Sequence, residues 1–188
     1  MPKQLSGLRW VTKFPTSQST DDLTEPFRTN CKKFVAAMQA AGANVTIAAT
    51  LRPPQRAYLM HFSFRIAKEL LDPALVPGMD GVDIEWVHRD TRGGVLLSES
   101  RDAAAMMVTG FAIVFRPALT SRHSEGNAID MNVFWTTPEL KIKNASGSDV
   151  IINSRSKNGS NADLQKVGKS YGVLKLVTDP PHWSNDGR

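Results

Sequence analysis

The stretch "SRHSEGNAIDMNVF", residues 121–134, joins a turn to the clearest strand signal in the chain. Apolar and polar residues alternate from residue 128 onward, which predicts a strand over 128–134 with Asp130 and Asn132 on one face. Gly126, just before the strand, permits a tight bend. The turn carries His123, so a histidine and a carboxylate lie seven positions apart in one local unit.

Outward from this stretch, helical and extended patterns mix without a regular βαβ order. Helices are predicted over residues 25–41, 53–71, 99–115 and 161–172, strands over 44–50 and 173–177, and a hairpin over 81–98. This mixture favours an α+β fold, a small antiparallel sheet flanked by helices. The length of 188 residues suits a single domain, 1–188, whose residues 1–20 form a loosely packed N-terminal segment.

Composition excludes several classes of protein. The formal net charge of +5 comes from dispersed basic residues, so we expect no nucleic-acid partner. The most apolar run, residues 103–115, is too short to cross a bilayer, and the first residues lack the apolar core of a signal peptide. We therefore expect a soluble protein made in the cytoplasm, without stable membrane insertion. The single cysteine, Cys31, lies on an apolar helical stripe and is predicted to be a buried hydrophobe.

A catalytic zinc ion needs three protein ligands and a fourth position open to water. His123, Asp130 and His182 supply such a set, although each alone is more typical of a turn, capping or core residue. In "TDPPHW", residues 178–183, two prolines separate Asp179 from His182 and are expected to hold an extended spacing. Asp179 is then free to act as a general base without binding the metal.

These motifs resemble those of the zinc D-Ala-D-Ala peptidases. "SRHSEGNAID" matches their S-x-H-x-x-G-x-A-x-D pattern, and "DPPHW" resembles their second motif, an acid two residues before a histidine followed by an aromatic residue. "TLRPPQ", residues 50–55, resembles a third motif, with Leu51 and Pro53 in place of the usual aromatic residue and serine. The family includes D,D-carboxypeptidases and the L-alanyl-D-glutamate endopeptidases of phage endolysins, and it shares its fold with Hedgehog signalling domains.

The resemblance implies one Zn²⁺ per chain, bound by His123, Asp130 and His182. It implies that Asp179 takes a proton from the attacking water and that Arg52 stabilises the oxyanion formed from the scissile carbonyl. The implied fold is that of the Hedgehog-like zinc peptidases, which we expect to place the metal at one edge of the sheet.

The resemblance also implies a substrate, the peptidoglycan stem peptide. Ser121, Gln55 and Trp183 would contact it, although Ser121 is equally typical of a turn and tryptophan is more often a core residue. We expect cleavage between L-alanine and D-glutamate or at a D-alanyl bond. The endopeptidase is preferred because its branch also carries Asp where many members carry Glu, as at Asp179. The enzyme would reach the wall after release by another agent.

Two alternatives stay open. A non-catalytic zinc-containing binding module could use the same fold, and a cytosolic dipeptidase could act on free D-Ala-D-Ala. The sequence leaves open which bond is cut, which biological system uses the protein, and the oligomeric state.

Overall fold

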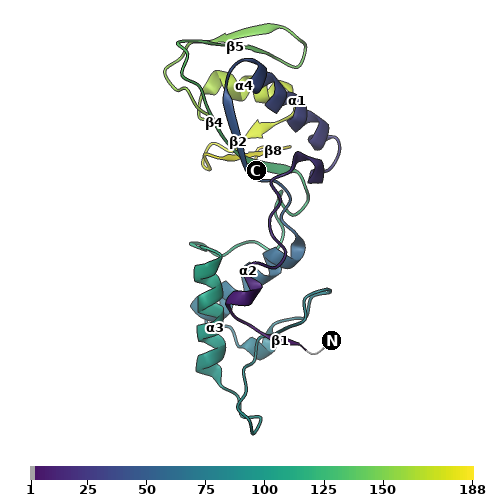
Figure 1. Ribbon diagram of the computed structural model, residues 1–188, viewed down its shortest axis with the longest axis vertical. Coiled ribbons are helices and arrows are strands. Elements are labelled where there is room, and N and C mark those ends of the chain that lie inside the picture. The colour runs from purple at the N-terminus through teal and green to yellow at the C-terminus, as the bar shows by residue number, and fades with distance from the viewer. Residues whose placement is uncertain (1–2) are drawn as a thin grey trace. The chain divides into compact units, whose positions relative to one another are not determined.

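The computed structural model describes residues 3–188, and the chain divides into two compact units (Figure 1). One unit contains residues 16–52 and 121–188, and the other contains residues 3–15 and 53–120. The helices are α1 (Phe27–Ala40), α2 (Pro54–Lys68), α3 (Leu97–Gly110) and α4 (Ala162–Ser170). The strands are β1 (Gln4–Leu5), β2 (Asn44–Ala49), β3 (Ile84–Glu85), β4 (Ala128–Phe134), β5 (Leu140–Lys143), β6 (Asp149–Ile152), β7 (Leu174–Lys175) and β8 (His182–Ser184).

The unit formed by residues 16–52 and 121–188 is built on a four-stranded antiparallel sheet. Its strand order is β2-β4-β8-β7, and β5 pairs separately with β6. The helices α1 and α4 belong to this unit, together with a short 3-10 helix, Thr20–Asp22. From Ile129 onward β4 alternates, so Ile129, Met131 and Val133 are buried in the core, while Asp130, Asn132 and Phe134 lie on the other face.

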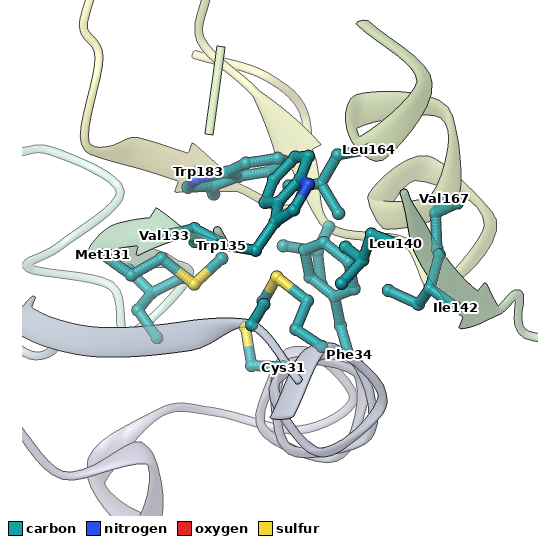
Figure 2. Close-up of a cluster of buried hydrophobic side chains, with 14 of the residues drawn as sticks. Cys31, Phe34, Met131, Val133, Trp135, Leu140, Ile142, Leu164, Val167 and Trp183 are labelled. Atoms are coloured by element: carbon teal, nitrogen blue, oxygen red, sulfur yellow. The ribbon is translucent and has the colours of Figure 1, made fainter. Parts of the chain in front are cut away.

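The core of this unit lies between the sheet and its two helices. Figure 2 shows side chains from α1, β4 and α4 meeting there, with Cys31 of α1 among them. Cys31 is 1% exposed, which confirms the predicted buried position, and burial raises the pKa of its thiol far above the usual range. The cysteine therefore takes part in packing and lacks the thiolate that reactivity requires.

The other unit packs α2 against α3. Trp10 of a 3-10 helix, Leu8–Trp10, is 2% exposed and belongs to its core, with Tyr58 of α2 and Trp86. The strands β1 and β3 form a short parallel pair in this unit. The predicted loose segment 1–20 thus contains a well-buried tryptophan, while residues 1 and 2 lie outside the described part. The prediction that 1–188 forms a single domain stays a prediction.

The structure confirms a mixture of helices and small antiparallel sheets, and it corrects several local predictions. The hairpin over 81–98 is reduced to one bridge, Arg89 to Val95, because the chain enters α3 at Leu97. That helix ends at Gly110 and not at residue 115, since Ala112 takes a left-handed backbone conformation with φ 55°. The β5–β6 hairpin and β8 were not predicted. No helix within residues 3–188 is both long and apolar enough to cross a membrane.

Candidate metal centre

The predicted metal ligands come together on the two central strands of the sheet. Asp130 of β4 is paired directly with His182, the first residue of β8. His123 comes from the turn that precedes β4, where Gly126 has φ 70° and thereby closes the bend. The expected position at the sheet edge is wrong, because β4 and β8 lie between β2 and β7.

Three donor atoms of these residues converge on one point. Asp130 Oδ1 lies 3.1 Å from His123 Nε2 and 3.0 Å from His182 Nδ1, and the two nitrogens are 3.2 Å apart. Tetrahedral Zn²⁺ with bonds of about 2.0–2.1 Å separates its ligand atoms by roughly 3.3 Å. The observed separations fit that geometry, so this group could hold a metal ion.

The outward-facing nitrogen of each histidine has its own acceptor. His123 Nδ1 lies 2.6 Å from the main-chain oxygen of Thr50, and His182 Nε2 lies 3.1 Å from that of Arg188. A carbonyl oxygen only accepts, so each of these nitrogens carries the proton and donates it. A neutral ring with its proton on the outer nitrogen has its lone pair on the inner nitrogen, His123 Nε2 or His182 Nδ1, where a metal ion could bind. This orientation by outer hydrogen bonds is typical of histidines that bind metals.

The charges of the three side chains also favour binding of a cation. Burial by itself raises the pKa of Asp130, but the adjoining rings of His123 and His182 outweigh it and hold that pKa below its usual range. Burial lowers the pKa of His182, whereas Asp130, the Arg188 carbonyl and the nearby Asp179 carboxylate raise it, and the net direction is upward. The site therefore presents an ionised carboxylate and two histidines that attract positive charge.

The segment of residues 50–55 is hydrogen-bonded to His123 through two main-chain groups. Thr50 accepts the hydrogen bond from His123 Nδ1, and the Arg52 amide donates to the His123 carbonyl at 3.0 Å. Thr50 itself is fully buried and fixed by hydrogen bonds to the main chain of Ser17 and Ser19. The backbone of Arg52 is thus held beside a metal ligand. Its partly buried guanidinium has no hydrogen-bond partner among residues 3–188.

Asp179 lies on an exposed turn beside His182. Its main-chain oxygen accepts from the His182 amide at 3.1 Å, so Pro180 and Pro181 occupy the middle of a turn and do not hold the extended spacing that was predicted. Lys175 donates to the main-chain oxygens of both ends of this turn, Asp179 and His182. The Asp179 carboxylate is exposed and, within the described residues, makes no hydrogen bond or ion pair.

The remaining predicted site residues take different positions. Ser121 begins the turn, where its hydroxyl accepts from the Ser124 amide at 3.3 Å, so a role in local structure is clear. Gln55 lies in the first turn of α2 and belongs to the other compact unit.

The prediction for Trp183 is corrected by its burial. The side chain is 0% exposed and packs on Phe34 in the core, with ring centroids 5.5 Å apart (Figure 2). It therefore anchors β8, next to His182, and has no surface to offer a substrate.

Sequence reasoning missed the groups that orient the ligands. The acceptors at Thr50 and Arg188 are main-chain oxygens, which every residue possesses, so no side-chain pattern marks them. Lys175 and Asp186 lie near the second motif, but their contacts depend on the folding of the segment around β8. No protein-family model matches this chain, and no curated protein matches it in sequence.

Proposed function

We propose that this protein is a zinc metallopeptidase that hydrolyses a peptide bond of the peptidoglycan stem peptide. The observation that carries the proposal is the convergence of His123 Nε2, Asp130 Oδ1 and His182 Nδ1 within 3.2 Å of one another. Each outer histidine nitrogen faces a main-chain oxygen, and this arrangement supports a metal-binding role for the two inner nitrogens.

The side chains around the ligands suit peptide hydrolysis. Zn²⁺, when bound, would make an attacking water more acidic and polarise a carbonyl group. The Asp179 carboxylate is exposed and, within the described residues, makes no hydrogen bond or ion pair, so it is accessible to a water molecule as a general base. It is also close enough to His182 to raise the pKa of that ring. Arg52, whose main chain is tied to His123, would donate hydrogen bonds to the carbonyl oxygen as negative charge develops.

An extended substrate also has a surface to occupy. Asn132 and Phe134 follow Asp130 along the same face of β4, and Phe134 is 51% exposed. A peptide lying along this face would meet an amide and an aromatic ring next to the metal ligands. The choice of stem peptide rests on the motif resemblance.

Digestion of purified peptidoglycan tests the proposal. Zinc-loaded protein should release fragments whose masses identify the cleaved bond, and a chelated sample should release none. A new amino terminus on D-glutamate identifies the endopeptidase, which we favour, whereas free D-alanine identifies the carboxypeptidase. Hydrolysis of free D-Ala-D-Ala but not of walls would favour the dipeptidase.

Two arginine variants sharpen the assay. Arg52→Ala should lower the rate by roughly 10²–10³-fold, as for loss of an oxyanion donor. Arg155→Ala, at an exposed arginine of the same unit, should leave the rate unchanged. Fully metallated protein that binds walls without producing new termini or free D-alanine would instead be a binding module.

A further inference from the structure

Asp186 collects hydrogen bonds from both sides of the metal centre. Its carboxylate accepts from Arg122 Nε at 3.0 Å and also from Arg122 Nη2. It accepts from the main-chain amide and the Nε of Arg188, each at 3.1 Å, and from Ser184 Oγ at 3.2 Å. The Arg122 guanidinium holds the pKa of Asp186 well below its usual range, so the carboxylate is charged.

Two partners of Asp186, Arg122 and Arg188, are each adjacent to or bonded to a metal ligand. Arg122 precedes His123 in the chain, and its Nη1 donates to Glu125 at 2.6 Å, so it spans the turn that carries His123. Arg188 provides the main-chain oxygen that accepts from His182 Nε2. One carboxylate thus connects the two ligand-bearing segments from outside the site.

We infer that Asp186 is a positioning residue of the metal centre, which holds the main-chain oxygen of Arg188 against His182 Nε2. This inference rests on the proposed metal site. Arg188 is exposed, and its main chain follows Gly187, which has φ 81°. The amide and the Nε of Arg188 both donate to the Asp186 carboxylate, and the Gly187 amide donates to Ser184 Oγ.

The consequence concerns the proton of His182. An oxygen that only accepts, placed against Nε2, keeps a proton on Nε2 and leaves Nδ1, the nitrogen nearest Asp130, for the metal ion. Without that acceptor, the proton is free to occupy Nδ1 and donate to Asp130, which blocks the nitrogen that would bind the metal. Loss of a single surface ion pair, such as Arg122 with Asp186, changes the free energy of unfolding little. A large drop in zinc affinity on substitution of Asp186 would therefore point to its role in positioning and not to a loss of stability.

Asp186→Asn tests the inference, because an amide nitrogen cannot accept from Arg122 or Arg188. Zinc affinity, measured by competition with a chelator, should fall roughly 10–100-fold, as for other outer partners of ligating histidines. NMR of the zinc-loaded protein should show a His182 Nε2–H proton that is protected from exchange with water in the wild type and exchanges faster in the variant. Asp149→Asn, which removes a carboxylate paired with Lys141 and Lys143 in the same unit, should change neither readout.

A second variant keeps the test decisive if Asp186→Asn fails to fold. Asp186→Glu retains the charge but displaces the carboxylate, and it should also weaken zinc binding and speed the exchange of the His182 Nε2–H proton. A folded variant with wild-type zinc affinity and unchanged His182 signals would overturn the inference. Wild-type protein that binds zinc as expected but cleaves no wall would overturn the proposed function and leave the role of Asp186 intact.

Discussion

Asp130 and His182 face each other across β4 and β8, with Asp130 Oδ1 3.0 Å from His182 Nδ1. They are 52 positions apart in the sequence, and only the pairing of two central strands brings them together. His123 joins them from the turn before β4. The rigidity of this group comes from the sheet, because two of its three members are part of the hydrogen-bonded ladder.

We expect each of these three residues to be required for zinc binding. His123→Ala, Asp130→Ala and His182→Ala should each weaken zinc binding by more than the roughly 10–100-fold typical of outer partners. Elemental analysis of purified protein should give one zinc per chain for the wild type. His61→Ala, which removes a histidine bonded to the Pro117 carbonyl in the other unit, should retain full stoichiometry. Full zinc content in His182→Ala would contradict the site.

Asp179→Asn should separate metal binding from catalysis. The exposed carboxylate is not one of the converging ligand atoms, so the variant should keep its zinc. Loss of a general base should lower the hydrolysis rate by roughly 10²–10⁴-fold. Asp163→Asn on α4 is the control, because Asp163 is another acid of the same unit, with a side chain 42% exposed and paired with Lys166. Near-normal turnover by Asp179→Asn would assign the base to another residue.

Gly168→Ala should destabilise the unit that holds the site. Alanine is favoured over glycine in a helix by about 1 kcal/mol, but an added Cβ here would lie 2.8 Å from the Trp183 ring and 2.8 Å from the Val173 carbonyl. Overpacking of this kind costs about 1–3 kcal/mol, which outweighs the helix preference. Denaturant unfolding should show a lower midpoint. Gly159→Ala, whose Cβ would meet Trp183 at an ordinary 3.9 Å, should change it far less.

The contribution of Asp186 to stability should disappear in acid. The pKa of this carboxyl is lowered from its usual 3.8 by Arg122, so folding stabilises the charged form. The contribution is complete above the unfolded value and is lost as the pH falls through the lower folded value. The difference in unfolding free energy between metal-free wild type and Asp186→Asn should therefore be constant above about pH 5 and shrink below pH 4. A difference that stays constant down to pH 2 would show that the ion pair contributes nothing.

The sequence by itself determined the local units and the chemistry they carry. The alternation of apolar and polar residues predicted the strand over 128–134, with Asp130 on the face away from the core. The apolar stripe of α1 predicted that Cys31 is buried. Such patterns are readable because backbone sterics and side-chain periodicity act over a few neighbouring residues. The spacing of His123 and Asp130, and the second motif around His182, were sufficient to name the three candidate ligands.

Only the tertiary structure decided how those units meet. It paired β8 with β4, turned Trp183 into the core, and made Pro180 and Pro181 the middle of a turn. It also supplied the carbonyls of Thr50 and Arg188 that orient the two histidines. Contacts of this kind join residues distant in sequence through main-chain groups that all residues share. Their partners are therefore fixed by the packing of the whole unit and leave no local pattern in the sequence.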